Sequence, residues 1–257
     1  MAKIGYGYGS EFQLLRFMGR HRLLLEEIIK KSINVDGTIK WLDFEFKDLD
    51  NDFVGDKELA GVDFLNQLSF VTDETIKEIN REIDNYEVRP MVSRQSWDAL
   101  FTIDDTLYIV EAKAHYDEML TKDYERASNE KILAFMKAML PEINVTEEWL
   151  KDYYQLANRL AFSALLSKHG VKTKTMCLFF ENGYQRKAII NNELRVLTDK
   201  DTSRQQFEDA MEKEMKTLGI THKNIYDIMT PSVFVDANPK RLKNEYNKQN
   251  IRYTDVI

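Results

Sequence analysis

The chain has 257 residues, of which 43% are hydrophobic and 31% charged, and its formal net charge is −7. This is the composition of an ordinary globular protein, and the length is sufficient for a substantial core. The acidic balance argues against a protein that coats nucleic acid through general charge, because such binding depends on many lysines and arginines that neutralise phosphates.

Membrane-spanning, secreted and cysteine-based zinc proteins are also disfavoured. No apolar run approaches the roughly 20 residues of a membrane-spanning helix, and the first residues lack the apolar core of a secretion signal. Cys177 is the only cysteine, so neither an intrachain disulfide nor a cysteine-based zinc site can form. We expect a cytoplasmic protein with no membrane partner.

No repeat, low-complexity tract or convincing linker divides the chain. We therefore expect residues 1–257 to form a single domain, with a core over about 10–181 and a C-terminal extension over 182–257.

The first predicted helix runs from Ser10 to about Lys31, and Ser10 and Gln13 have the spacing of a capping box. Glu11 lies at the N-terminal end of an apolar stripe. The stripe consists of Leu14, Leu15, Met18, Leu25 and Ile29. Glu11 could reach a buried site, or it could be a first-turn Glu favoured by the helix dipole. Arg20, in the basic cluster of this helix, could contact phosphate oxygens, although surface arginines usually have no such role.

The next segments contain weaker candidates. The pattern predicts a strand over 41–46, an acidic loop over 50–58, and a helix over 73–86 that ends before Pro90. Asp63 lies among apolar residues and could be a further site carboxylate, although a turn or cap is the more typical role.

A β-hairpin is predicted over residues 97–114. Two runs rich in β-branched and aromatic residues flank the Asp-Asp pair at 104–105, which is typical of a tight turn. If the two residues next to the turn face each other, Asp98 faces Glu111, because the residue numbers of opposed positions in a hairpin always add up to the same total. Lys113, two residues after Glu111, shares that face of the sheet.

These three ionisable groups have apolar surroundings. The second strand is hydrophobic on both faces, as in a strand that is covered on both sides. Two opposed carboxylates repel each other, and burial makes each charge costlier. We therefore expect positive charge between them, supplied by Lys113 and by a divalent cation with oxygen ligands.

The Glu-x-Lys pattern occurs three times in the chain, so by itself it carries little information. The copy at 214–216 lies in a highly charged helical stretch, where a solvated face is expected. The copy at 45–47 alternates with apolar residues, a pattern that sends its charges to water. Only the copy at 111–113 combines an apolar strand with an opposed Asp.

Further candidates follow the hairpin. His115 would share the face of Glu111 if the strand continued, and could then transfer a proton or contact phosphate, although a lone His at a strand end is more often structural. A helix is predicted over 146–168, where Gln155 and Arg159 belong to a polar stripe of the kind that is usually solvated.

The remaining expected segments are a helix over 117–140, a strand over 173–181, a helix over 202–218 and an edge strand over 232–235. A basic stretch over 240–252 either guides a substrate or is a solvated tail.

An Asp on one strand of a hairpin and Glu-x-Lys on the next resemble the active site of the PD-(D/E)XK nucleases, the restriction-endonuclease-like superfamily. The segments 9–22, 61–65 and 153–161 also look like an uncharacterised branch of that superfamily, so the likeness spans most of residues 5–181. Asp98 follows tryptophan where the superfamily name has proline, at a position that varies widely in the group.

The resemblance implies an α/β fold with a central mixed β-sheet flanked by helices and a restriction-endonuclease-like core. It also implies a nuclease that hydrolyses phosphodiester bonds, with DNA as the expected substrate and Mg²⁺ as the cofactor, for which Mn²⁺ can substitute. Asp98, Glu111 and the carbonyl of Ala112 would hold the metal ion. Lys113 would orient the attacking water and offset charge on the phosphate, and Glu11 would complete the site.

In nucleases of this type the helix after the Glu-x-Lys strand often flanks the active site. This makes Gln155 and Arg159 candidates for substrate contacts, beside His115 and Arg20. A homodimer is compatible with this prediction. Two alternatives stay open: a catalytically silent protein of the same fold that binds nucleic acid or a protein partner, and a structural protein in which the three ionisable groups form a buried ion-pair cluster.

Overall fold

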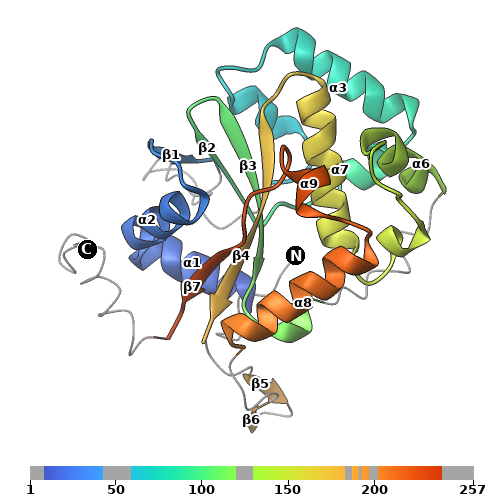
Figure 1. The fold of residues 1–257 in the computed structure, drawn as a ribbon. Coiled ribbons are helices and arrows are strands. Elements are labelled where there is room, and N and C mark those ends of the chain that lie inside the picture. Colours follow the sequence, from blue (N-terminus) through green and yellow to red (C-terminus); the bar gives the residue numbers. More distant parts are fainter. Residues whose placement is uncertain are drawn as a thin grey trace.

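A five-stranded mixed β-sheet with the strand order β1-β2-β3-β4-β7 forms the centre of the molecule (Figure 1). The structure is a computed structural model that describes residues 9–42, 59–119, 130–182, 187–190, 193–196 and 202–238. The strands are β1 (Ile39–Trp41), β2 (Ala99–Ile103), β3 (Thr106–Lys113), β4 (Thr173–Glu181) and β7 (Val233–Asp236). The first three are antiparallel neighbours, whereas β4 runs parallel to β3 and β7 parallel to β4.

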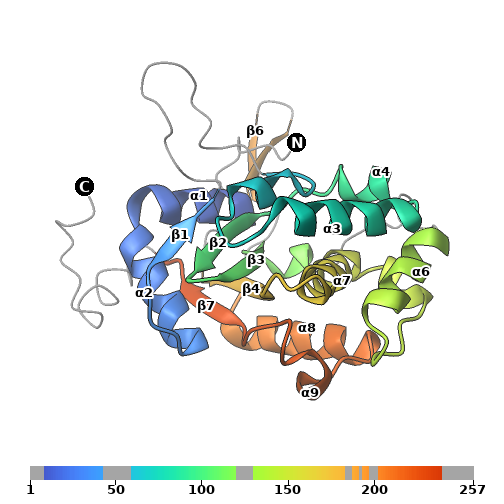
Figure 2. The ribbon, with the colours of Figure 1, turned by 90° about the horizontal axis from the view of Figure 1, so that it is seen from above.

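Helices cover both faces of this sheet (Figure 2). On one face α1 (Ser10–Arg20) and α2 (Arg22–Ile33) bury side chains such as Phe101 and Val110. On the other face α7 (Tyr154–Lys168) packs with the cluster that contains Leu100 and Ile109. The prediction of an α/β protein with a central mixed sheet flanked by helices is confirmed.

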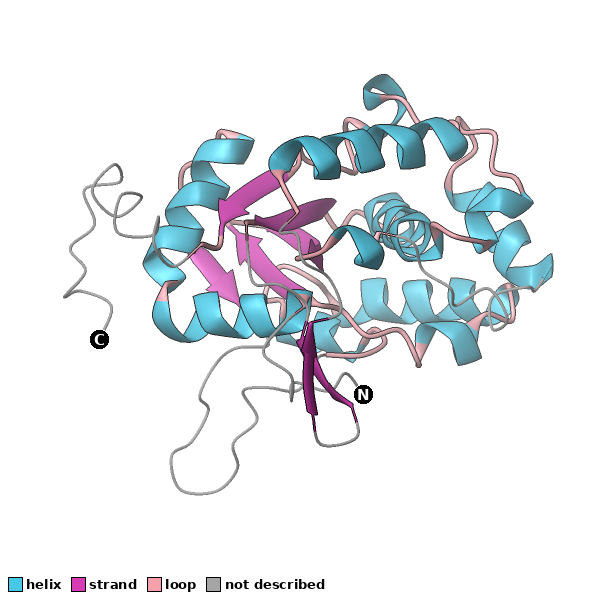
Figure 3. Ribbon diagram, turned by 90° about the horizontal axis from the view of Figure 1, so that it is seen from below, coloured by secondary structure: helices cyan, strands magenta, loops and turns pink. Residues whose placement is uncertain are grey.

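The remaining elements surround this core. A separate two-stranded sheet, β5 (Lys187–Ile190) and β6 (Glu193–Val196), lies apart from the central sheet (Figure 3). The other α-helices are α3 (Asp73–Asn85), α4 (Arg89–Val92), α6 (Glu130–Met139), α8 (Arg204–Thr217) and α9 (His222–Ile225), and the 3₁₀ helices are η2 (Asp63–Gln67), η3 (Tyr116–Glu118) and η4 (Glu147–Leu150).

The predicted hairpin register is confirmed. Ile103 pairs with Thr106 and Leu100 with Ile109, around a turn in which Asp104 has a positive φ of 49°. Opposed residues share a face of the sheet, so the even-numbered positions of β2 and the odd-numbered positions of β3 face α7. The side chains of Glu111 and Lys113 consequently point toward α7.

The single helix predicted over 10–31 is wrong, because the chain forms α1 and α2 with a break at His21 (φ −137°). Gly19, a poor helix former, precedes the break, and the buried His21 ring packs on Phe17 with ring centroids 5.3 Å apart. The apolar spacing did not reveal the break because the buried positions of both helices contact the same core.

The helix predicted over 146–168 begins eight residues later than expected, at Tyr154. The residues before it form η4, and Lys151 leaves the helical conformation with φ −99° and ψ −131°. Trp149 explains the break, since it is buried and its indole N–H donates a 3.0 Å hydrogen bond to the carbonyl of Leu218. This contact turns the segment toward the end of α8.

Most other predicted elements are present. The helix over 73–86, the strand over 173–181, the helix over 202–218 and the edge strand over 232–235 correspond to α3, β4, α8 and β7. Thus β7, from the predicted C-terminal extension, is a strand of the central sheet. The predictions for residues 43–58, 120–129 and 239–257 lie outside the described residues, and they include the Glu-x-Lys copy at 45–47 and the basic stretch over 240–252.

Within the described ranges, no helix has the length and apolar character needed to cross a membrane.

Candidate active site

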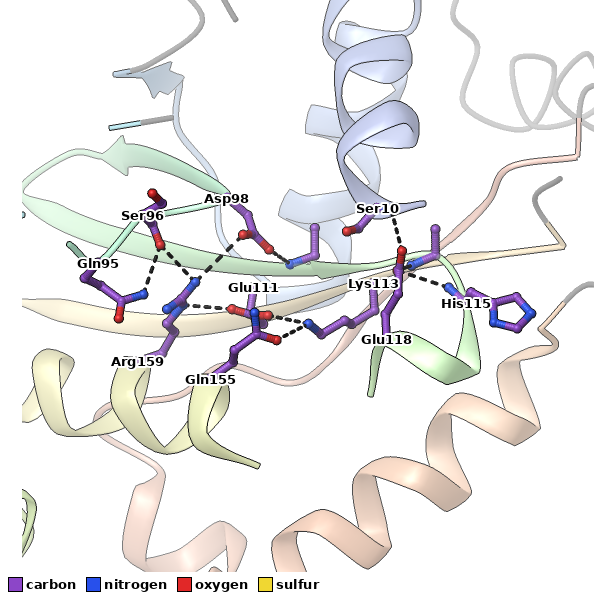
Figure 4. A network of polar contacts seen from close by, with 12 residues as sticks. Ser10, Gln95, Ser96, Asp98, Glu111, Lys113, His115, Glu118, Gln155 and Arg159 are labelled. Carbon is purple, nitrogen blue, oxygen red and sulfur yellow. Dashed lines mark hydrogen bonds and ion pairs between the residues drawn. The ribbon is translucent and has the colours of Figure 1, made fainter. Parts of the chain in front are cut away.

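The two carboxylates of the predicted site lie at the same end of the hairpin (Figure 4). Asp98 forms a bend immediately before β2, and Glu111 is on β3. Asp98 Oδ2 accepts a 2.7 Å hydrogen bond from the backbone N–H of Ala112, which holds this carboxylate against the strand that carries Glu111. The side chain of Glu111 is 4% exposed and that of Asp98 is 23% exposed, so Asp98 lies on the side of the site that is open to solvent.

Lys113 joins the acidic pair, as predicted. Its Nζ lies 2.6 Å from Glu111 Oε1 and donates a 2.6 Å hydrogen bond to Gln155 Oε1 on α7. Burial alone would lower the pKa of Lys113, but the carboxylates of Glu111 and Asp98 outweigh burial and raise this pKa. Lys113 is therefore a charged ammonium group held between β3 and α7 (Figure 4).

Arg159 supplies the second positive charge. Its Nε lies 2.8 Å from Glu111 Oε2, and its Nη2 lies 3.8 Å from Asp98 Oδ1. Nη2 also donates a 3.1 Å hydrogen bond to the carbonyl of Ser96, and the guanidinium lies 5.1 Å from the centre of the Trp97 ring. The side chain is only 2% exposed. The expectation of a solvated polar stripe is thus wrong for Arg159, because the stripe faces the charged end of β3.

The two carboxylates have different proton affinities. Burial, together with the charge of Glu111, raises the pKa of Asp98 to about 7, against the opposing effect of Arg159 and Lys113. Burial also acts to raise the pKa of Glu111, but Arg159 and Lys113 contact it directly and leave its pKa lowered. Glu111 is therefore ionised at neutral pH, while Asp98 exchanges a proton near that pH.

The contacts of Arg159 lead to a stability prediction. We expect Arg159→Lys to lower the free energy of unfolding by about 1–3 kcal/mol, because an ammonium group cannot reach both carboxylates and the Ser96 carbonyl while it lies against Trp97. Urea unfolding at pH 7 measures this cost. A matched control is Arg204→Lys. Arg204 also pairs with acidic oxygens through two nitrogens and lies 4.7 Å from an aromatic ring centre, but its side chain is 53% exposed. Its replacement should cost less than about 1 kcal/mol; equal costs at the two positions would contradict this assignment.

His115 does not take the position predicted for it. β3 ends at Lys113, and His115 caps η3, where its Nδ1 accepts a 3.1 Å hydrogen bond from the backbone N–H of Asp117. Its ring points away from Glu111 (Figure 4). The strand does not continue to His115, because the capping contact of His115 turns the chain into η3 directly after Lys113. This geometry agrees with the structural role that a lone His at a strand end usually has.

Glu11 and Arg20 lie at opposite ends of α1. Glu11 is partly buried in the first turn, and the backbone N–H of Ser10 beside it donates a 3.1 Å hydrogen bond to Glu118 Oε1 near the end of β3. Contact between Glu11 and a metal ion stays a prediction. Arg20 is exposed in the last turn, about 15 Å along the helix axis from Ser10, so the structure does not bring it to the carboxylates. Asp63 is also exposed, at the start of η2, as expected for a turn residue.

Glu214 was missed by the sequence analysis, which expected a solvated face over 214–216. Its side chain is buried and lines a cavity of about 20 Å³ together with Glu111, Lys113 and Gln155. Burial raises the pKa of Glu214 to about 8, although the charge of Lys113 opposes this shift. The periodicity contained the signal, because Glu214 occupies a place in the buried stripe of α8. The buried residues of α8 are Phe207, Ala210, Met211, Glu214 and Met215.

Three further polar residues, Gln95, Ser96 and Glu118, were also missed. Ser96 contacts Arg159 through its carbonyl oxygen, and Gln95 contacts Asn158 on α7 through its side chain. The sequence does not indicate which backbone carbonyls accept a side-chain hydrogen bond. Glu118 also follows the strand in a position where an exposed glutamate is expected, so no pattern indicated its contacts.

The side chains of the site determine whether it can bind a metal ion. Searched over the described residues, the structure holds no group of three or more His, Cys, Asp or Glu side chains spaced to bind a metal ion. Both Glu111 carboxylate oxygens and the Nε and Nη1 atoms of Arg159 are buried and make no hydrogen bond in the part of the chain that is described. Glu111 contacts Lys113 and Arg159 as ion pairs. Mg²⁺ usually binds one or two protein carboxylates plus water and substrate phosphate, so the pair Asp98 and Glu111 suits Mg²⁺.

Comparisons with protein-family models, with curated proteins and with solved protein structures found no match.

Proposed function

We propose that this protein is a Mg²⁺-dependent nuclease that hydrolyses phosphodiester bonds in DNA. One observation carries the proposal: Asp98, Glu111 and Lys113 meet at one end of the hairpin, on the sheet face covered by α7. The arrangement agrees with the resemblance to PD-(D/E)XK nucleases, and a restriction-endonuclease-like core is part of the same proposal. The flanking positions of Gln155 and Arg159 on α7 add support.

The donor set fits a magnesium ion. Asp98 and Glu111 would bind Mg²⁺ or Mn²⁺ together with the carbonyl of Ala112, and Glu11 would complete the site. Lys113 and Arg159 lie 2.6 and 2.8 Å from the two oxygens of Glu111 and keep this carboxylate ionised, which is the form that binds a metal ion. When bound, the ion would polarise the phosphate and lower the pKa of a water molecule.

The side chains around the carboxylates have separate tasks in the proposed reaction. Lys113, held by Gln155 and Glu111, orients the attacking water and offsets the negative charge that builds on the phosphate oxygens. The resemblance makes Arg159 a candidate for a phosphate contact. Its Nε and Nη1 have no hydrogen bond among the described residues, but both are buried, so such a contact requires the site to open when the substrate binds. The partly exposed Asp98 marks the side from which the substrate approaches.

A second candidate function is supported by the charges of the same cluster. Arg159 and Lys113 together balance Asp98 and Glu111 without any metal ion. This balance is what we expect of a catalytically silent protein of the same fold, which would bind nucleic acid or a protein partner. Such a protein need not bind Mg²⁺ or Mn²⁺ through the two carboxylates.

The test measures metal binding and cleavage separately. We expect the wild-type protein to bind Mn²⁺ in calorimetry and to cleave at least one of single-stranded, double-stranded or branched DNA in the presence of Mg²⁺. Glu111→Gln removes one metal ligand and should weaken Mn²⁺ binding and slow cleavage by at least about 100-fold.

Asp63→Asn is the control, since it removes an exposed carboxylate outside the cluster and should change neither result. Mn²⁺ binding without cleavage of DNA but with cleavage of RNA would replace the substrate in the proposal. If the wild-type protein and Glu111→Gln bind Mn²⁺ equally, the metal site is wrong and the silent alternative stands.

A further inference from the structure

Glu118 joins two segments that are far apart in the sequence. Its Oε1 accepts a 3.1 Å hydrogen bond from the backbone N–H of Ser10, at the start of α1. Its Oε2 accepts hydrogen bonds from the backbone N–H groups of Ala114 (2.7 Å) and His115 (3.3 Å), immediately after β3. Figure 4 shows this carboxylate between the end of β3 and the first turn of the helix.

The backbone beside Ser10 is adapted to this contact. Gly9 has a φ of +91°, a conformation that residues with a side chain rarely adopt, and a Cβ added to Gly9 would lie 3.0 Å from Glu118 Oε1. The close approach of α1 to Glu118 therefore depends on glycine for both its conformation and its lack of a side chain.

The same contact lies next to the candidate active site. Ala114 directly follows Lys113, and the negative charge of Glu118 also acts on the Lys113 ammonium group. Ser10 directly precedes Glu11, the carboxylate predicted to complete the metal site. One side chain thus connects the strand end that carries Lys113 with the helix turn that carries Glu11.

We propose that Glu118 is a positioning residue that holds the end of β3 and the start of α1 in one arrangement, and thereby places Lys113 for the reaction. Its catalytic consequence rests on the proposed nuclease function, whereas its effect on the position of Lys113 does not. A carboxylate suits this role because it has only acceptor atoms, and it meets three donors.

The test replaces Glu118 with glutamine. The glutamine side chain would present an NH₂ group to at least one backbone N–H, so at least one of the three hydrogen bonds is lost and the end of β3 relaxes. We expect Glu118→Gln to lower kcat for Mg²⁺-dependent cleavage by about 10- to 100-fold, with KM changed less than twofold. The side-chain NMR signal of Lys113, assigned by its disappearance in Lys113→Arg, should shift. Gly9→Ala perturbs the same contact from the other side and should shift that signal too.

Asn224→Ala is a matched control for the loss of a capping contact. Asn224 Oδ1 accepts a 2.9 Å hydrogen bond from the backbone N–H of Thr221 in the capping box of α9, a helix that supplies none of the site residues. This variant should lower Tm to a similar extent as Glu118→Gln, while kcat and the Lys113 signal stay unchanged.

The outcomes distinguish this inference from the proposed function. If the wild-type protein cleaves and Glu118→Gln cleaves equally fast with an unshifted Lys113 signal, Glu118 is a structural cap only and the inference is overturned. If the wild-type protein cleaves no nucleic acid, the proposed function fails. The Lys113 signal then decides alone: a shift in both Glu118→Gln and Gly9→Ala supports the positioning role, and no shift overturns it.

Discussion

Lys113→Ala is expected to reduce Mg²⁺-dependent cleavage by at least about 100-fold while it costs only about 1 kcal/mol of the free energy of unfolding. The rate should fall because Lys113 is the ammonium group held between Glu111 and Gln155, where it can offset charge on a phosphate. The cost in stability should be small because Arg159 remains 2.8 Å from Glu111. In addition Asp98, whose pKa is about 7, can take up a proton and so remove one negative charge.

A structural ion-pair cluster predicts the opposite pattern. If the only role of the cluster were to hold the fold together, removing one buried partner would cost about 3–5 kcal/mol. Replacing a residue at a functional site, in contrast, often lowers the free energy of unfolding only slightly. Urea unfolding and cleavage assays on the same preparations separate the two cases, and a cost above about 3 kcal/mol with no change in cleavage would support the structural alternative.

Two variants serve as controls for this experiment. Lys113→Met keeps the apolar part of the side chain, so the difference between the Met and Ala variants measures lost packing rather than lost charge. Lys151→Ala removes a lysine from a surface ion pair with Glu148 and should change neither cleavage nor stability by a measurable amount.

Glu214→Gln is expected to make the protein more stable than the wild type at high pH, by roughly 3–5 kcal/mol at pH 9. Burial raises the pKa of Glu214 from its ordinary value of 4.5 to about 8. The folded state therefore binds the proton more tightly than the unfolded state does. Gln is neutral at every pH and has nearly the same shape as the protonated carboxyl group.

The direction of the pH dependence follows from proton linkage. Below pH 4.5 Glu214 is protonated in both states, and its contribution to stability is fully present. Between pH 4.5 and 8 the unfolded state loses the proton while the folded state keeps it, so stability falls as the pH rises. Above about pH 8 both states are ionised and the contribution is lost.

Denaturant unfolding at pH 5, 7 and 9 checks this prediction. The wild-type protein and Glu214→Gln should have similar stability at pH 5 and diverge as the pH rises. The difference between them isolates Glu214, because Asp98 and Glu111 titrate in both proteins. Glu212→Gln, an exposed neighbour on α8, should follow the wild-type curve. Parallel curves for the wild type and Glu214→Gln would show that the Glu214 carboxyl group is not buried in the folded protein.

The hairpin was predictable because its determinants are local. The turn at 104–105 sets the register, and the period of two along each strand then places Asp98, Glu111 and Lys113 on one face. Gln155 and Arg159 were also candidates, but only through the resemblance, since their polar spacing on a helix is equally typical of a solvated surface. Periodicity says which residues share a helix face, and it does not say what that face contacts.

The sequence by itself therefore determined the hairpin register and the shared face of three ionisable residues, because these depend on turn chemistry and strand periodicity over short distances. The α/β class was expected through the resemblance. Only the tertiary structure decided that Arg159 lies between the carboxylates, that Glu214 is buried beside Lys113, and that Glu118 connects β3 with α1. The contacts of Arg159 with the carboxylates, of Glu214 with the site and of Glu118 with Ser10 join segments that are dozens of residues apart. The packing of whole elements against the sheet sets which of these side chains meet.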